Sequence, residues 1–224
     1  VLCVALLLVG VQEPERAAST VRNNPIRREN LRRLGGAYWW VVALGAVFTL
    51  ARFSEAFLLL RVQQGGLPLA WTPLVLVLMN VVFALGAYPL GKLADSTRHT
   101  TLLAWGLVVL IAADALLAFS DRGAAAWLGI ALWGLHMAMT QGLLATMVAD
   151  TAPADLRGTA FGMFNLVSGV ALLVASGLAG LLWDRLGASA TFGAGMLFAT
   201  LALAGVLVQS ARHGRTPKPP ATQG

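Results

Sequence analysis

Charged residues are scarce in this chain. They make up 12% of its 224 residues, whereas a soluble domain of this length carries about 25%. Hydrophobic residues make up 58%, the mean hydropathy is +0.74, and several apolar runs reach the roughly 20 residues needed to cross a hydrocarbon core. This balance excludes a soluble globular domain and predicts an all-α, polytopic bundle of transmembrane helices in a lipid bilayer.

Cysteine is almost absent as well. The single cysteine, Cys3, allows no disulfide within the chain, and no cluster of Cys and His has the spacing of metal ligands. The sequence also lacks a glycine-rich loop ending in Lys-Ser or Lys-Thr, which argues against a built-in ATP motor. We therefore expect no metal site and no cofactor.

Basic residues outnumber acidic ones, 16 to 10, but they are confined to the loops and tails between the apolar runs. That distribution is typical of membrane topology and not of a phosphate-binding face. We expect no nucleic-acid partner.

Six complete spans are expected. They lie at about 38–62, 68–90, 100–119, 124–149, 158–183 and 187–209. Residues 1–11 are apolar but too few to cross a bilayer, so we interpret them as the end of a preceding transmembrane helix. The expected organisation continues with a basic linker at 12–37, a six-helix transmembrane domain at 38–210 and a tail at 211–224.

The distribution of basic residues predicts the orientation in the membrane. If the linker is cytoplasmic, twelve Lys and Arg residues fall on the cytoplasmic side and three on the other, a strong positive-inside bias. The twelve are Arg16, Arg22, Arg27, Arg28, Arg32, Arg33, Lys92, Arg98, Arg157, Arg212, Arg215 and Lys218, and the three are Arg61, Arg122 and Arg185. We expect a cytoplasmic C-terminus and a location in the plasma (inner) membrane.

A charged run separates two of the expected spans. It reads Gly91-Lys92-Leu93-Ala94-Asp95-Ser96-Thr97-Arg98. Gly91 is expected to permit a tight turn, and Asp95 to lie near a helix N-terminus, where the helix dipole attracts negative charge. The run resembles the loop signature of the major facilitator superfamily of transporters, roughly Gly-x-Leu-Ala-Asp-Arg-x-Gly-Arg-Arg. Ser96 and Arg98 depart from that pattern, because an Arg and a Gly are usual there.

The resemblance implies the second half of a twelve-span transporter. The six complete spans would be the seventh to twelfth, and a six-helix N-terminal half would be the missing partner. The run would lie on the cytoplasmic side, where Asp95 would help to close that face against the opposite half, with Arg98 as its local partner. The alternative is a solvated loop in which Asp95 only caps a helix.

A second connection, 150–162, resembles the family's loop between the tenth and eleventh spans. Pro153 is expected to stop one span, and Arg157 and Gly158 open the next. Gly158 and Gly162 form a small-xxx-small face that permits close helix contact, so Arg157 and Gly158 join the expected gate. Static packing is the alternative.

Charged residues also occur inside an expected span. Arg52 and Glu55 are three residues apart, so on a continuous helix they share a face and can pair. Charges at membrane depth are costly and usually face a cavity or the bundle interior. The pair could be structural, Glu55 could bind a proton, or Arg52 could bind an anion.

Six further polar residues within the expected spans are candidates for buried positions: Asn80, Asp114, His136, Gln141, Asn165 and Ser168. The resemblance places the seventh, eighth, tenth and eleventh spans around the cavity, which favours Asn80, His136, Gln141 and Asn165 as pore-facing. It disfavours Asp114, for which we expect a structural pairing. His136 could relay protons or pack beside Trp133.

The leading functional hypothesis is a secondary transporter that moves a small molecule by alternating access. Protons are the expected coupling ion, with Glu55 as the titrating group, and the sparse polar lining favours efflux of a drug or metabolite. The alternatives are a non-transporting membrane scaffold or sensor and a membrane-embedded enzyme. We expect no enzymatic activity, because Glu55, Asp114 and His136 are scattered over separate spans.

Overall fold

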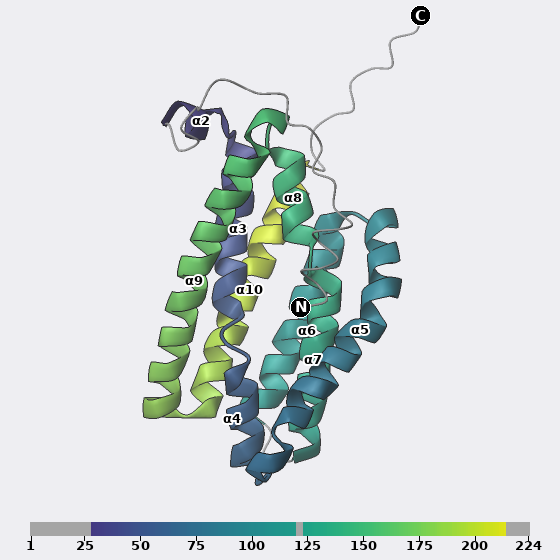
Figure 1. Cartoon of the computed structure of the whole chain (residues 1–224), viewed down its shortest axis with the longest axis vertical. Helices are drawn as coiled ribbons and strands as arrows, with labels where there is room; N and C mark the ends of the chain where they lie inside the picture. The colour runs from purple at the N-terminus through teal and green to yellow at the C-terminus, as the bar shows by residue number, and fades with distance from the viewer. Residues whose placement is uncertain (1–27, 120–122, 214–224) are drawn as a thin grey trace, which may run out of the picture.

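The computed structural model describes residues 28–119 and 123–213, and that part of the chain consists of helices joined by short connections, without strands (Figure 1). The long helices are α3 (Gly36–Ala51), α4 (Ala56–Gln64), α5 (Pro73–Ser96), α6 (His99–Phe119), α7 (Gly123–Thr140), α8 (Leu143–Thr151), α9 (Arg157–Leu186) and α10 (Ala188–His213). Three short elements complete the order: α2 (Arg28–Arg33) and the 3-10 turns η1 (Leu69–Trp71) and η2 (Ala154–Leu156). The expected helix end at 1–11, most of the basic linker and the tail from 214 onward lie outside the described residues.

Six stretches are long and apolar enough to cross a membrane. They are Gly36–Gln64, Leu69–Ser96, His99–Phe119, Gly123–Thr151, Ala154–Leu186 and Ala188–Ala211. The expected all-α bundle with six spans is therefore confirmed. Figure 1 shows the long helices running roughly along one axis, with α2 at the top of the view and α4 at the bottom. We call these the α2 end and the α4 end.

The first and fourth spans are interrupted, although the sequence predicted continuous helices there. In the first span α3 ends at Ala51 and α4 begins at Ala56. The backbone N–H of Arg52 donates to Thr49 O at 3.0 Å, and the Ser54 hydroxyl accepts from the N–H of Ala56 at 3.3 Å. These local bonds replace helical ones, as Ser side chains do at helix ends. The fourth span breaks at Gly142, whose φ of +90° lies in the left-handed region that favours glycine.

The turn between α5 and α6 is shorter than the sequence predicted. Helix α5 continues to Ser96, so only Thr97 and Arg98 separate it from α6. Gly91 therefore lies inside a helix and does not make the turn. Asp95 is exposed in the last turn of α5, and its expected position at a helix N-terminus is wrong. Good helix formers at 92–94 extend the helix past the point where apolar residues stop.

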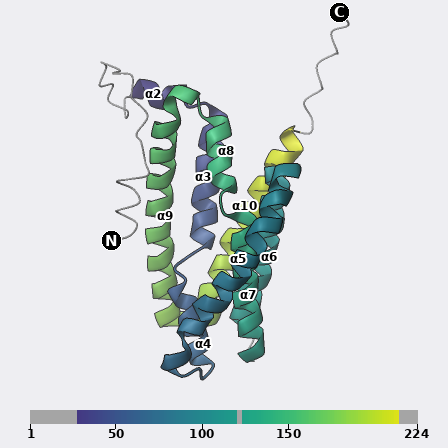
Figure 2. The same ribbon diagram turned by 45° about the vertical axis from the view of Figure 1, so that its right-hand side comes forward.

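Helix α6 lies at the centre of one side of the bundle. It packs against α7 and α10, and α7 in turn packs against α5. One face of α6 is fully buried and includes Leu103, Leu107, Leu110 and Leu117. On the other side α3 packs between α9 and α10, and Figure 2 shows α9, α3 and α8 spreading away from α5, α6 and α10 towards the α2 end.

Glycines allow the closest helix approaches. A Cβ added at Gly134 of α7 would overlap the backbone carbonyl of Met79 in α5, so the two helices touch there without a side chain between them. Gly106 and Gly129 make similar approaches between α6 and α7. The expected close contact at Gly158 and Gly162 is not formed within the described chain, because no atom lies within 4 Å of an added Cβ at either position.

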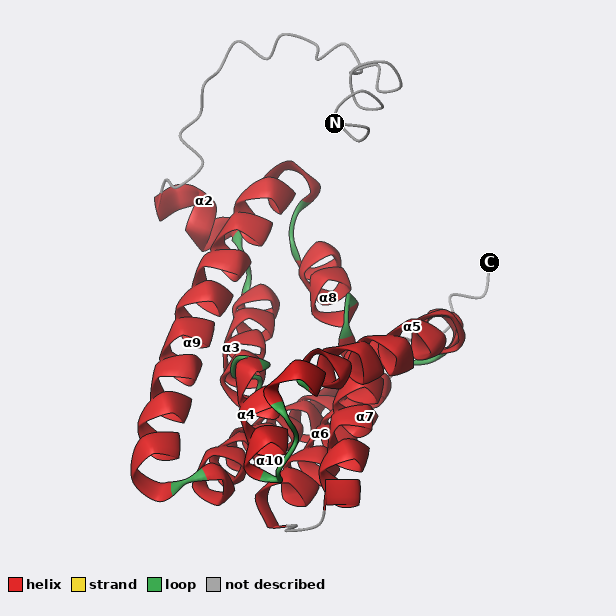
Figure 3. Ribbon diagram, turned by 60° about the horizontal axis from the view of Figure 1, so that its bottom comes forward, coloured by secondary structure: helices red, strands yellow, loops and turns green. Residues whose placement is uncertain are grey.

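Helices α5 and α9 form opposite edges of the bundle (Figures 1 and 3). In each of these two spans only 17% of the most apolar 18-residue stretch is buried inside the protein, whereas the corresponding share is 33–50% in the other four spans. Large apolar side chains stand exposed on them, including Leu85 and Tyr88 of α5 and Leu173 of α9. These two edges face lipid or another set of helices.

Candidate functional site

A cavity of about 430 Å³ opens at the break between α3 and α4. Its lining comes mainly from the break and the last turn of α3: Phe48, Thr49, Arg52, Phe53, Ser54 and Glu55. Trp133 of α7 and Leu172 of α9 complete it. Because the break falls near the middle of a 29-residue span, this cavity lies at the depth of the hydrocarbon core.

Arg52 does not pair with Glu55. No contact within 4.0 Å joins their charged groups, which overturns the pairing that the i, i+3 spacing predicted. The helix ends before Arg52, so the spacing no longer places both side chains on one helical face. The Nε of Arg52 is buried without a hydrogen-bond partner, and its Cζ lies 5.7 Å from the centre of the Phe48 ring, within the range of a cation–π contact.

His136 lies behind the aromatic wall of this cavity and does not line it. The residue is fully buried, with its ring centroid 5.5 Å from that of Phe48 and 6.4 Å from that of Trp133. Its Nδ1 lies 2.8 Å from the carbonyl of Gly106, and because a carbonyl only accepts, Nδ1 carries the proton. His136 is therefore a packing residue beside Trp133, as the alternative hypothesis held, and it does not face the cavity.

Asp114 makes the structural pairing that the sequence suggested for it, and its partner is Trp133. The indole Nε1 of Trp133 donates to Asp114 Oδ1 at 3.0 Å, and both residues are buried. Helix α10 approaches closely at this point, since a Cβ added at Gly195 would lie 2.7 Å from Asp114 Oδ2. The carboxylate of α6 thereby fixes the orientation of an indole ring that lines the cavity.

The other expected pore residues are not gathered at this cavity. Asn80 and Asn165 are exposed on the edge helices α5 and α9, and Gln141 is exposed at the break between α7 and α8. The Asn80 amide donates to Leu76 O of its own helix at 2.8 Å. The structure therefore brings Arg52 and Glu55 together with aromatic residues, and it leaves the three amides elsewhere.

Three aromatic residues of the site, Phe48, Phe53 and Trp133, were not expected from the sequence. Phe48 and Trp133 lie in apolar runs, where an aromatic residue looks like any core residue, and Phe53 lies between charged and polar neighbours that are the more conspicuous candidates. In the structure the rings of Phe53 and Trp133 lie with their centroids 6.1 Å apart, and the ring of Phe48 packs against His136. The interruption of the helix by Arg-Phe-Ser-Glu was the available signal.

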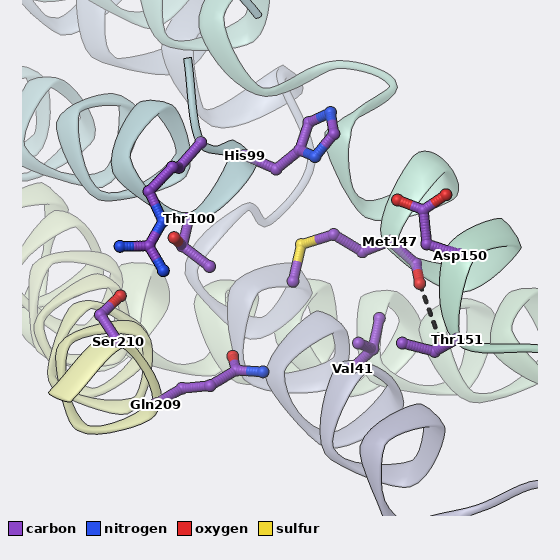
Figure 4. Close-up of a pocket in the computed structure, with 9 residues that line it drawn as sticks. Val41, His99, Thr100, Met147, Asp150, Thr151, Gln209 and Ser210 are labelled. Atoms are coloured by element: carbon purple, nitrogen blue, oxygen red, sulfur yellow. Dashed lines mark hydrogen bonds between the residues drawn. The ribbon is translucent and has the colours of Figure 1, made fainter. Parts of the chain in front are cut away.

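A second cavity, of about 360 Å³, lies at the α2 end between α3, α6, α8 and α10. Its lining is Val41, Arg98, His99, Thr100, Met147, Asp150, Thr151, Gln209 and Ser210. Figure 4 shows Gln209 and Ser210 on one side of it and Asp150 and Thr151 on the other. The Thr151 hydroxyl donates to the Met147 carbonyl at 2.7 Å. Of the expected gate residues only Arg98 lines this cavity.

The remaining gate residues surround this end. Arg157 and Gly158 are exposed at the start of α9, and Gly91 and Asp95 are exposed near the end of α5. Close by, Arg33 of α2 forms an ion pair of 2.7 Å with Asp155. The hydroxyl of Tyr38 donates to Ala160 O at 2.9 Å, which joins α3 to α9 at the same level.

Comparison with known proteins identifies the family. The family model described as the Major Facilitator Superfamily matches residues 1–176. The chain belongs to the major facilitator superfamily. It is thus a multi-pass membrane protein of a transporter family.

Two known proteins of similar sequence or fold are longer than this major facilitator chain. It is 29% identical over 184 residues to the uncharacterized MFS-type transporter MJ1317 of Methanocaldococcus jannaschii, an alignment that covers 80% of this chain and 46% of that protein. The chain therefore spans about half the length of this curated relative. The crystal structure of an auto inhibited POT family peptide transporter superposes with a TM-score of 0.66 at 22% identity, covering 82% of this chain and 39% of the other. This second likeness concerns the fold.

Proposed function

We propose that the intact protein is a secondary transporter that carries a small molecule across the membrane by alternating access. The observation that carries this proposal is the cavity at the break of the first span, lined by Arg52 and Glu55. Non-helical backbone at membrane depth is tolerated where it lines a cavity or is buried in protein. Charged side chains at that depth mark substrate and ion pathways, and transporters of this kind bind their cargo at interrupted helices near the midplane.

The six spans are proposed to supply one wall of the transport pathway. The exposed apolar edges on α5 and α9 would pack against an N-terminal six-helix half. The membership of the transporter family and the half-length match to the relative support this arrangement. In this arrangement the cavity at the break is one side of a larger central site.

The α2 end is proposed to be cytoplasmic, with the C-terminus on the same side of a plasma (inner) membrane. The positive-inside bias of the sequence supports this orientation. The gate that closes this side would then comprise Gly91, Asp95, Arg98, Arg157 and Gly158, of which Arg98 lines the cavity at this end. We infer that this second cavity is the cytoplasmic vestibule.

Proton coupling and export are the finer parts of the proposal. Glu55 lines the central cavity without a basic partner within 4.0 Å, so it is the group that we assign to proton binding. The apolar character of the remaining lining favours a cargo with apolar surface, which is typical of drug or metabolite efflux. Asn80, Gln141 and Asn165 are exposed in this half and are assigned secondary roles, to be completed by the opposite half.

The test is transport by the full-length protein in proteoliposomes. Uptake and efflux of a panel of small molecules are measured with and without a pH gradient, and protein-free liposomes serve as the control. At least one compound is expected to cross faster than the control and to accumulate only while the gradient lasts. If no compound moves faster than in protein-free liposomes, the protein is a scaffold or sensor and the proposal is wrong.

A further inference from the structure

We propose that the central cavity binds an organic anion with an apolar body, through the guanidinium of Arg52. This inference rests on the proposed function and names the class of its cargo. Arginine keeps its charge at any pH that a protein experiences and carries five N–H donors. Its Nε is buried without a hydrogen-bond partner, and in the described chain the guanidinium forms no ion pair within 4.0 Å, so that Glu55 attracts it only from a longer distance. A buried charge without an acceptor is costly, and an anion in the cavity would supply one.

Glu55 does not supply a hydrogen-bond acceptor for Arg52. Its charged group is more than 4.0 Å away, and its carboxylate oxygens are not among the buried atoms of the described residues that lack a partner. The carboxylate is therefore open to the cavity and can remain hydrated, whereas the Nε of Arg52 cannot. The break in the helix separates the two groups that a continuous helix would have paired.

The guanidinium is held in position before any ligand arrives. It lies over the Phe48 ring, with 5.7 Å between Cζ and the ring centroid. Helix α4 also begins at Ala56, beside the cavity, and the positive end of a helix dipole favours a negative group. A donor that is already oriented loses less entropy when it binds its ligand.

The rest of the lining on this side offers few hydrogen-bond donors to a sugar or another polyhydroxylated cargo. Phe48, Phe53, Trp133 and Leu172 offer apolar surface. The hydroxyl of Thr49 already donates to Gly45 O at 2.7 Å, and the indole N–H of Trp133 donates to Asp114. Ser54 is then the one neutral side chain of the lining with a proton left to donate. A cargo recognised here therefore presents one anionic group to Arg52 and an apolar or aromatic body to the rings.

The size of the cavity agrees with such a ligand. Its volume of about 430 Å³ lies within the roughly 300–1,000 Å³ of small-molecule sites. The aromatic walls can stack against a planar body, and aromatic pairs stabilise such contacts beyond simple burial.

The test compares ligands that share an apolar body and carry an anionic, a neutral or a cationic head group. Binding of indole-3-acetate, neutral indole-3-acetamide and cationic tryptamine to the detergent-solubilised full-length protein is measured by thermal shift and equilibrium dialysis. The comparison is repeated with decanoate, decanamide and decylamine. In at least one series the anion is expected to bind about tenfold more tightly than the amide, because a charge-assisted hydrogen bond is roughly twice as strong as a neutral one.

Variants assign the preference to Arg52. Arg52→Gln is expected to abolish the preference for the anion, and Arg52→Lys to keep part of it. Arg185→Gln removes the same charge at an exposed position at the end of α9 and is expected to leave the preference intact. If Arg52→Gln does not fold, binding of the anion, the amide and the cation to the wild-type protein still tests the preference for an anion.

The inference is overturned if the cation or the amide binds best, if none of the anions binds, or if folded Arg52→Gln keeps the preference. Its failure is distinguishable from that of the proposed function. Anion binding without transport contradicts the transporter proposal alone, and transport of neutral or cationic compounds without anion binding contradicts this inference alone.

Discussion

Gly134→Ala is expected to lower the stability of the helix bundle by about 1–3 kcal/mol, the usual cost of overpacking. The added methyl would overlap the Met79 carbonyl of α5 and lie 3.2 Å from Val82 Cβ. A backbone atom inside a helix cannot move aside as a flexible side chain can, so α5 and α7 must separate. Gly134→Leu extends the side chain further and is expected to abolish the folded fraction. Thermal melts of the solubilised full-length protein and size-exclusion profiles measure both effects.

Gly193→Ala is the matched control. Gly193 lies in α10, a membrane helix outside the two edges proposed to meet the other half, and no atom lies within 4 Å of an added Cβ there. Replacing a helical glycine by alanine removes an unfavourable propensity of up to about 1 kcal/mol. The control is therefore expected to melt at the same temperature or slightly higher. Equal melting of Gly134→Ala and the wild type would contradict the close packing of α5 on α7.

Glu55→Gln is expected to reduce proton-driven accumulation of the cargo at least tenfold and to leave the protein folded. Glu55 lines the central cavity and has no basic partner within 4.0 Å. The substitution therefore breaks no direct ion pair, although it removes the longer-range attraction between Glu55 and Arg52, and glutamine keeps the shape of the side chain. Exchange of labelled for unlabelled cargo at equal pH should persist, because it requires no net proton movement. Accumulation and exchange are both measured in proteoliposomes that contain the full-length protein.

Asp184→Asn is the control for the loss of one negative charge. Asp184 is exposed near the end of α9 and does not line the central cavity. Proteoliposomes that contain this variant should accumulate as much cargo as those that contain the wild type. If Glu55→Gln accumulates cargo as well as this control, Glu55 does not couple transport to protons.

The number and type of the spans could be predicted because they follow from one physical requirement. In the hydrocarbon core the backbone polar groups must be hydrogen-bonded within the chain, which a helix achieves. Crossing the core as a helix takes about 20 apolar residues. Each of the six spans in the structure lies within a few residues of its predicted position. Their ends were less predictable: α5 runs on to Ser96, because helix propensity continues where apolarity stops.

The interruption at Arg52–Glu55 could not be predicted in the same way. Apolarity averaged over a span hides four residues that include Phe53, and the i, i+3 spacing of Arg52 and Glu55 also suits an intact helix. The local competition from Ser54 and the ring of Phe48 beneath the guanidinium exist only in the folded chain. The charged residues of the site were thus identified from the sequence, while their separation was not.

Asn80, Gln141 and Asn165 show a second limit of sequence reasoning. A polar residue in an apolar span is expected to face a cavity or a neighbouring helix, but the sequence of one half does not say where the opposite half lies. All three are exposed, and Asn80 and Asn165 lie on the edge helices α5 and α9. Their assignment to the transport pathway remains a prediction that depends on those edges meeting other helices.

The central claim is that the cavity at the α3–α4 break opens to both sides of the membrane in turn. Its most direct test is the labelling of Ser54→Cys by a membrane-impermeant thiol reagent, in full-length protein whose other cysteines, Cys3 included, are replaced by serine. The reagent is applied from each side in right-side-out and inside-out vesicles. Leu197→Cys, which is 58% exposed on α10, is the control that should resist labelling from both sides. We predict that Ser54→Cys reacts from either side; reaction from neither side, or from one side under all conditions, would contradict the account.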